Sequence, residues 1–194
     1  HRAESFMSGG LMKDGRDSDA AAIVLGLRKA LKDWPVRDID AHIARGHDGY
    51  WTAYSLKTLH HQALLIQKAE NLGTPLVVDT DIDRGKGATE VTIYAGDHPG
   101  LFSRISGAMA LSGANIVEAK ITTLNNGKGL DSFLIQDSTG SAFSRPDEKM
   151  ARLSELINKA LAGELSIASE LSKRQSQLNR TSVFTVEPRV IIDN

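Results

Sequence analysis

The sequence predicts an α+β protein with a helical first part and a mixed second part. In the first 73 residues, apolar residues recur every three or four positions, as they do on one face of an α-helix. After Gly73 apolar and polar residues alternate, which is typical of β-strands. Two alternating segments flank Asn126 and Gly127, a pair that favours a tight turn between antiparallel strands. We therefore divide the chain into a helical connector (residues 1–73) and a mixed domain (residues 74–194, core 89–192).

The helical connector contains three predicted helices, which begin at Ser18, at about Asp38 and at about Ser55. Pro35 ends the first helix because proline disfavours the helical conformation of the residue before it. Gly73 ends the third helix because glycine readily takes the left-handed conformation that follows many helices. These signals predict a compact helical segment that leads directly into the mixed domain.

The mixed domain carries, in chain order, a strand, a helix, two strands, a helix and a last strand. The predicted ranges are 89–95, 101–112, 115–123, 130–137, 146–163, and finally 182–186 with 189–192. With right-handed crossovers, this βαββαβ order predicts a ferredoxin-like sheet of strand order 4-1-3-2 with both helices on one face. Asn126 and Gly127 predict a type I′ turn, which needs positive φ at both positions. A further short strand at 76–78 has no free edge beside strand 89–95, so its pairing stays open.

The loop between the first strand and the first helix of this domain reads Asp97-His98-Pro99-Gly100-Leu101. Pro99 fixes its own φ and restrains His98, while Gly100 keeps side chains out of the turn. The first amides of the following helix are then left unpaired, and such a helix N-terminus is a ready site for a carboxylate.

The element order and the Asp-x-Pro-Gly-Leu turn together resemble the ACT domain, a small regulatory module that senses amino acids. Longer runs resemble one enzyme family more specifically, and they cover residues 89–102, 113–117, 135–137 and 184–194. They are similar to the C-terminal region of the bacterial PII uridylyltransferase/uridylyl-removing enzymes, at the connector and first ACT domain. Trp34-Pro35 and Gly49-Tyr50-Trp51 also resemble that connector, so the resemblance extends from about Ser18 onward.

The resemblance implies a ligand site, because amino-acid-binding ACT domains contact the ligand with the loop after the first strand and with the start of the second strand. The implied residues are Asp97, His98, Gly100, Leu101, Asn115, Ile116 and Val117. The amides of Gly100 and Leu101 would take the ligand carboxylate and Asp97 its ammonium. Asn115 offers a donor and an acceptor for a carboxamide. For Gly100 and Asn115 the simpler alternative is a plain turn residue.

The catalytic motifs of that family do not occur in this chain. Its nucleotidyltransferase site is a Gly-Ser pair followed by an Asp-x-Asp pair that binds Mg²⁺, and Asp79-Thr80-Asp81 has the spacing without the Gly-Ser pair. Its hydrolase site uses adjacent His and Asp with further ligands, whereas His47-Asp48 lies in a glycine-flanked loop that we expect to end a helix. We expect no catalytic residue, metal or cofactor here, with Mg²⁺ belonging to the parent enzyme.

The composition is that of an ordinary globular protein. The 194 residues are 41% hydrophobic and 24% charged, and the formal net charge of −1 gives no reason to expect nucleic acid or a membrane surface as partner. The chain contains no cysteine, which excludes disulfides and thiolate catalysis and fits a cytoplasmic protein. Because it begins with His1 and ends just after a predicted strand, we expect a region of a longer protein.

The resemblance implies a regulatory function in bacterial nitrogen control, with glutamine as the amino-acid effector. The implied partners are glutamine, the PII signal protein through the parent enzyme, and a second ACT domain or a second copy of this chain. Two alternatives stay open: a structural ACT module that pairs and binds no ligand, or the ACT regulatory domain of another amino-acid-responsive enzyme. Catalysis by this chain itself would need a carboxylate–metal site that the sequence does not supply.

Overall fold

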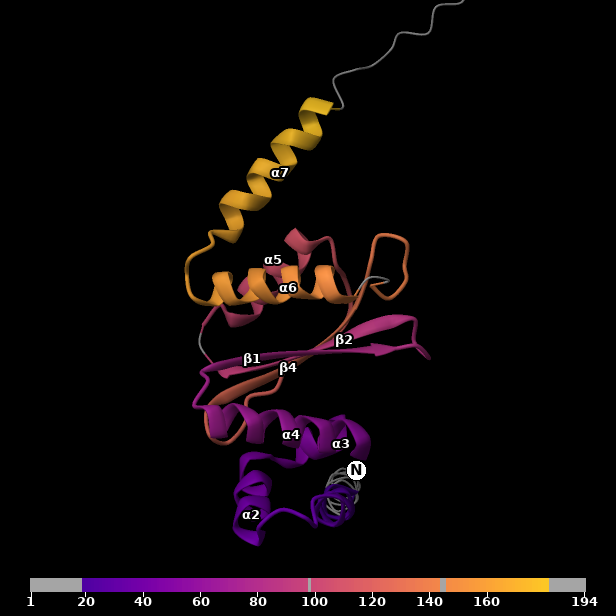
Figure 1. Cartoon of the computed structure of the whole chain (residues 1–194), viewed down its shortest axis with the longest axis vertical. Coiled ribbons are helices and arrows are strands. Elements are labelled where there is room, and N and C mark those ends of the chain that lie inside the picture. The colour runs from indigo at the N-terminus through magenta and orange to yellow at the C-terminus, as the bar shows by residue number, and fades with distance from the viewer. Residues whose placement is uncertain (1–18, 98, 144–145, 182–194) are drawn as a thin grey trace, which may run out of the picture.

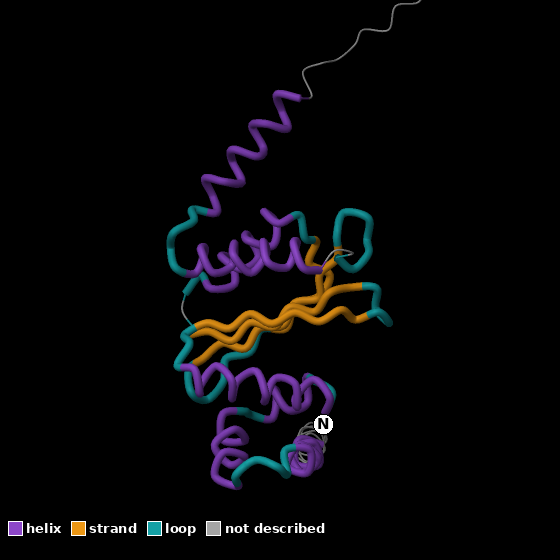
Figure 2. Tube along the Cα trace, viewed as in Figure 1, coloured by secondary structure: helices purple, strands orange, loops and turns teal. Residues whose placement is uncertain are grey.

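The computed structural model describes residues 19–97, 99–143 and 146–181. A four-stranded sheet lies between two helical layers (Figures 1 and 2). The helical connector contributes a helix at residues 19–30, α2 (Val36–Arg45), α3 (Asp48–Ala53) and α4 (Leu56–Leu72). The rest contributes β1 (Leu76–Asp83), β2 (Ala88–Gly96), α5 (Leu101–Ser112), β3 (Asn115–Lys120), β4 (Lys128–Gln136), α6 (Pro146–Leu161) and α7 (Ile167–Thr181). The predicted α+β class is confirmed.

The sheet has the strand order β1-β2-β4-β3, and every neighbouring pair is antiparallel. The arrangement of β2, β4 and β3 is the 1-3-2 part of the predicted sheet. β1 occupies the other edge of β2, from Leu76 opposite Ala95 to Asp83 opposite Ala88, where the predicted 4-1-3-2 order had placed the last strand. That part of the predicted order is wrong, because the adjacent β1 takes this edge. A four-residue turn joins β1 to β2, so this hairpin closes locally. The open question about strand 76–78 is thereby answered, while Ser18 and the predicted last strand at 182–192 lie outside the described residues.

The turn before β4 differs from the predicted type I′ turn. A type I′ turn needs positive φ at both Asn126 and Gly127, but only Gly127 has it (74°). Every described residue with positive φ is a glycine. β3 ends at Lys120, three residues earlier than predicted, and the chain returns through a longer loop. This loop is closed by hydrogen bonds from the Leu124 amide to the Lys128 carbonyl (2.8 Å) and from the Gly127 amide to the Leu124 carbonyl (2.9 Å).

Each face of the sheet covers its own hydrophobic core. On one face α5 and α6 enclose a core that includes the apolar side chains of α5. Its buried members are Val91, Ile93, Ala95, Leu101, Ile105, Ala108, Met109, Ala114, Phe133, Ile135, Phe143, Leu153, Ile157 and Ala160. On the other face, Tyr94 and Leu130 pack against buried side chains of the helical connector, among them Leu27, Trp51 and Leu59. The connector is therefore the second layer of the sheet, as Figure 1 shows.

Polar contacts also fasten the connector to the sheet. Tyr50 Oη donates to Gln62 Oε1 at 3.0 Å, and Gln62 Nε2 donates to Ser132 Oγ at 3.3 Å, with all three groups buried. No helix in the described parts of the chain is long and apolar enough to cross a membrane.

Candidate functional site

The turn between β2 and α5 has the predicted form. Gly100 has φ of 85° and is the N-cap residue of α5, so no N-cap side chain bonds the first amides of that helix. The Gly100 carbonyl accepts hydrogen bonds from the Arg104 amide and from Ser103 Oγ, both at 3.0 Å. A residue with a side chain is strained at this φ, so the turn requires glycine whether or not a ligand binds. His98 lies outside the described residues.

Two predicted site residues in this turn have definite structural positions. The Asp97 carboxylate is exposed and accepts a hydrogen bond from Thr123 Oγ1 at 2.6 Å, which holds it against the loop after β3. The Leu101 side chain is buried in the α5/α6 core and is only 5% exposed. Leu101 can therefore offer a ligand its backbone amide, but not its side chain.

The other predicted half of the site lies at the start of β3. Asn115 Nδ2 donates to the Asp137 carbonyl at 3.3 Å, so its amide already bridges to the end of β4. Ile116 and Val117 are 38% and 57% exposed on a strand at the edge of the sheet. A β-bulge between Ile116 and Glu118 interrupts the regular pairing there.

The structure does not bring the two predicted halves together within one chain. β3 is parallel to β2, because both pair antiparallel to β4. Asn115 lies opposite Gln136 at one end of β4, whereas the Asp97 turn lies near Gly129 at the other end. Seven residues of β4 separate these ends, which corresponds to about 24 Å at roughly 3.4 Å per residue.

A functional candidate that the sequence predictions missed is Asp131, on β4 below the same turn. Its side chain is 2% exposed, and Oδ1 has no hydrogen-bond partner in the described structure. The pKa of Asp131 is raised to about 6, mainly by burial, with a smaller contribution from the negative charge of Asp97 and against the effect of a hydrogen bond from the Thr122 backbone. The sequence signal that could have identified it is its spacing. Asp131 precedes Phe133 and Ile135 at intervals of two residues, so the three side chains lie on the same face of the strand.

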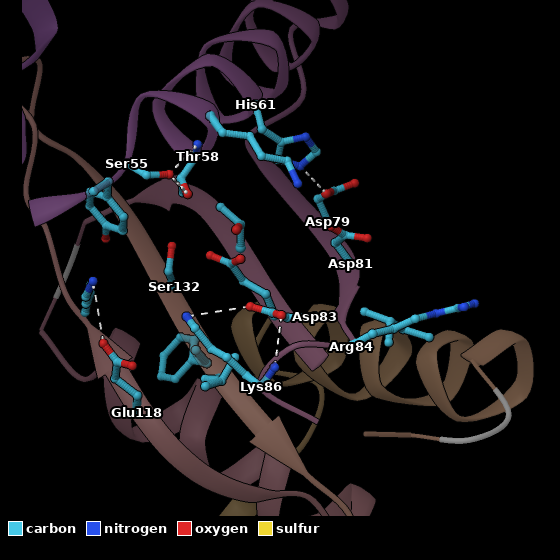
Figure 3. Close-up of a pocket in the computed structure, with 18 residues that line it drawn as sticks. Ser55, Thr58, His61, Asp79, Asp81, Asp83, Arg84, Lys86, Glu118 and Ser132 are labelled. Atoms are coloured by element: carbon cyan, nitrogen blue, oxygen red, sulfur yellow. Dashed lines mark hydrogen bonds and ion pairs between the residues drawn. The ribbon is translucent and has the colours of Figure 1, made fainter. Parts of the chain in front are cut away.

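A polar hollow of about 720 Å³ lies on the opposite face, between the start of α4 and the part of the sheet that the connector leaves uncovered (Figure 3). Its lining residues include Tyr54, Ser55, Lys57, Thr58, His61, Asp79, Asp81, Asp83, Arg84, Lys86, Glu90, Thr92, Glu118, Lys120 and Ser132. His61 Nε2 contacts Asp79 Oδ2 at 2.7 Å, and Lys120 pairs with Glu118 at 3.5 Å. Much of the charge in the hollow is therefore paired within the chain.

The two motifs that resembled catalytic pairs have structural positions of their own. Asp79 and Asp81 lie on β1, and no group of three or more His, Asp or Glu side chains in the described residues is placed to hold a metal ion. His47 Nδ1 accepts a hydrogen bond from the Tyr50 amide at 3.3 Å and so caps the start of α3. The sequence predicts that this His-Asp pair ends a helix. It begins one, because the imidazole satisfies a free amide of the first turn.

Comparison with known proteins bears on the whole chain. No family model matches it. The chain is 45% identical to a protein of Azospirillum brasilense over 195 residues, 36% to one of Gluconobacter oxydans over 200, and 35% to one of Rhodospirillum rubrum over 193. Each is named bifunctional uridylyltransferase/uridylyl-removing enzyme. This chain is homologous to one region of these enzymes.

The matches cover 99–100% of this chain but only 20–21% of the relatives' length. The chain thus spans about one fifth of the bifunctional uridylyltransferase/uridylyl-removing enzymes that it matches. The resemblance seen in the sequence motifs is confirmed.

Proposed function

We propose that this chain is an amino-acid-sensing regulatory region of a bifunctional uridylyltransferase/uridylyl-removing enzyme, with glutamine as its effector. The observation that carries the proposal is similarity along the whole chain to one region of that enzyme. The glycine-capped start of α5 supports it, since free amides at a helix N-terminus favour a carboxylate. The chain would act in the cytoplasm and would affect the PII signal protein through the catalytic parts of the enzyme, which bind Mg²⁺.

The separation of the two half-sites favours a ligand shared between two domains. β3 is an edge strand with exposed Ile116 and Val117, and such an edge can pair with another strand. If two β3 edges pair antiparallel, Asn115 of one domain meets the end of β3 in the other, which is the end that carries the Asp97 turn. Each pair would then form two complete sites. The partner is a second copy of this chain or a second ACT domain.

Regulation follows from differential binding. A ligand that contacts both domains stabilises the paired arrangement, whereas a ligand with equal affinity for both arrangements would shift nothing. Because the connector is packed on the sheet, a change in pairing moves the connector together with the domain.

Calorimetric titration with glutamine tests the proposal, at a chain concentration where light scattering shows a dimer. We expect binding by the wild type and none by Gly100→Val, whose side chain would project at the carboxylate site. Gly73→Val is the matched control, because Gly73 also has positive φ and open space around it but lies at the end of α4. Each change should cost about 1–2 kcal/mol of stability through backbone strain.

The outcomes separate the candidate functions. Glutamine binding by both variants alike would place the site elsewhere. A dimer that binds no glutamine would support the pairing-only alternative, which the exposed β3 edge also favours. A strict monomer at high concentration would contradict both the shared site and the pairing module.

Catalysis has its own assay, in which the chain is incubated with PII, UTP and Mg²⁺. We expect no turnover above a blank. Turnover that is lost on changing Asp79 or Asp81 would show that the chain itself is an enzyme.

A further inference from the structure

Asp131 is a buried acid directly beneath the turn that starts α5. It lies opposite Ile93 of β2 and on the same face of the sheet as Phe133. Both of these residues belong to the α5/α6 core, so the Asp131 side chain is on the α5 side of the sheet. Two residues before it on the same face is Gly129, where a Cβ atom would lie 3.2 Å from Leu101 Cδ2 and 3.9 Å from Asp97 Cβ. Asp131 is therefore two residues along β4 from the position that adjoins Leu101, at the start of α5, and Asp97.

The surroundings of Asp131 suit a cation better than they suit an anion. Its Oδ1 atom is buried without a partner, and a buried polar atom without a hydrogen bond is costly. The charged group that acts on it within the described residues is another carboxylate, Asp97. Two neighbouring carboxylates in a poorly solvated position repel each other, and an ammonium group between them would remove the repulsion and supply the missing donor.

We propose that Asp131 binds the ammonium group of the amino acid whose carboxylate meets the N-terminus of α5. This inference rests on the proposed function and revises the role that the motif alone gave to Asp97. The Asp97 carboxylate already accepts a short hydrogen bond from Thr123, whereas Asp131 has a free acceptor at greater depth. Asp97 steers the cation by charge, and Asp131 makes the direct hydrogen bond.

The burial of Asp131 also gives the site a way to exclude other ligands. At 2% exposure, the Asp131 carboxylate becomes accessible to a ligand only when neighbouring groups move. A ligand with a carboxylate alone has no group that compensates for this rearrangement. The turn thus selects α-amino acids over simple carboxylic acids.

The test compares glutamine with 4-carbamoylbutanoate, which is glutamine without its α-ammonium group. Calorimetry on the dimer should show that wild type prefers glutamine by roughly 10- to 100-fold, as expected for hydrogen bonds to a charged group. Asp131→Asn, which keeps the shape of the side chain, should bind both compounds within about threefold of each other. Asp79→Asn is the control on the opposite face and should keep the wild-type preference.

The outcomes separate this inference from the function on which it rests. If wild type binds glutamine and Asp131→Asn keeps the full preference, Asp131 does not bind the ammonium, while amino-acid sensing stands. If wild type binds no glutamine, both are overturned.

If Asp131→Asn fails to fold, carbon-13 NMR of the wild-type Asp131 carboxyl decides. Saturating glutamine should lower the pKa of this carboxyl, because an adjacent ammonium stabilises the ionised form. An unchanged pKa would overturn the inference.

Discussion

The two faces of the sheet are buried by different means. The α5/α6 face is covered by aliphatic and aromatic side chains from helices within the mixed domain, with Ile93 and Phe133 at its centre. The connector face also has an apolar core, but the buried chain of hydrogen bonds from Tyr50 through Gln62 to Ser132 crosses it. Apolar contacts tolerate small shifts, whereas a buried hydrogen-bond network is destabilising if some of its donors or acceptors lose their partners. The hydrogen bonds thus help to fix the position of the connector, and the turn that starts α5 is on the other face.

The faces also differ in the ionisable group that each one buries. Asp131 faces α5, while His42 is 1% exposed in the connector between the rings of Trp34 and Trp51. Neither ring nitrogen of His42 has a hydrogen-bond partner in the described structure. Burial lowers the pKa of His42 to about 4, with a smaller contribution from Arg45, whereas it raises that of Asp131. The two groups therefore give stability opposite dependences on pH.

The largest expected effect on stability comes from comparing two glycine-to-alanine changes, one in the connector and one on the α5 side of the sheet. Gly46→Ala would drive a Cβ atom into the Trp51 ring, which is 4% exposed and has no room to move. We expect a loss of about 3 kcal/mol in the free energy of unfolding, measured by urea denaturation. Gly107→Ala on α5 would overlap Ile167, but this side chain at the first turn of α7 can shift, so we expect about 1 kcal/mol. A greater loss for Gly107→Ala would reverse the comparison.

The second prediction separates the two buried ionisable groups by pH. The lowered pKa of His42 contributes stability that is present above pH 6.5 and is lost as the pH falls toward 4. The raised pKa of Asp131 contributes stability that is present below pH 3.8 and is lost as the pH rises through about 6. Between pH 7 and 5 these contributions change by about 2 and about 1 kcal/mol in opposite directions.

The variants should therefore diverge on acidification. Asp131→Asn should lose stability between pH 7 and 5 more steeply than wild type, and His42→Phe should lose less than wild type or gain. Urea denaturation of the three proteins at both values of pH measures this. Parallel curves would mean that neither buried group changes its ionisation on folding.

The third prediction concerns the buried hydrogen bonds that link Tyr50, Gln62 and Ser132. Tyr50→Phe removes the hydroxyl that donates to Gln62 Oε1 and leaves this buried acceptor unsatisfied. We expect a cost of about 1–2 kcal/mol by thermal or urea unfolding. In the double variant Tyr50→Phe with Gln62→Leu, the cost should be less than the sum of the single changes. Strict additivity would show that the two groups do not interact in solution.

The smallest effect is expected at the rim of the connector face. Glu70 accepts hydrogen bonds from Tyr94 Oη (2.8 Å) and Lys128 Nζ (2.9 Å), and these partners lower its pKa. Because Glu70 and Lys128 are about one-third exposed, solvent screens the pair, and Glu70→Gln should cost less than about 1 kcal/mol. A much larger cost in the same unfolding assay would show that this rim contributes to fixing the connector.

Local sequence signals predicted those helices and strands whose ends they mark. The range of α5 matched to the residue, because Gly100 and Gly113 fix both of its ends by their left-handed conformation. The pairing of β1 could not be predicted, since it depends on which segment occupies the free edge of β2. The turn type at Gly127 failed for a related reason: where β3 stops is decided by its pairing with β4 and not by the turn residues.

The candidate site was predicted only in part, because its residues depend on strand direction. Asp97 follows the end of β2 and Asn115 begins β3, and the parallel course of β2 and β3 puts these two positions at opposite ends of the sheet. Asp131 was missed because a single acid in an alternating strand resembles a solvent-facing residue. Only the burial of its face by α5 distinguishes it.

The loop after β3 joins the two faces within three residues. Thr123 donates a hydrogen bond to Asp97 at the turn before α5, and Asn125 Nδ2 donates to the carbonyls of Ala44 (3.1 Å) and Gly46 (2.8 Å) at the end of α2. This short loop therefore links the turn before α5 to the end of α2 across the edge of the sheet. If an amino acid binds at this turn as proposed, displacing Asp97 from Thr123 would free one end of the loop and change the restraint on α2.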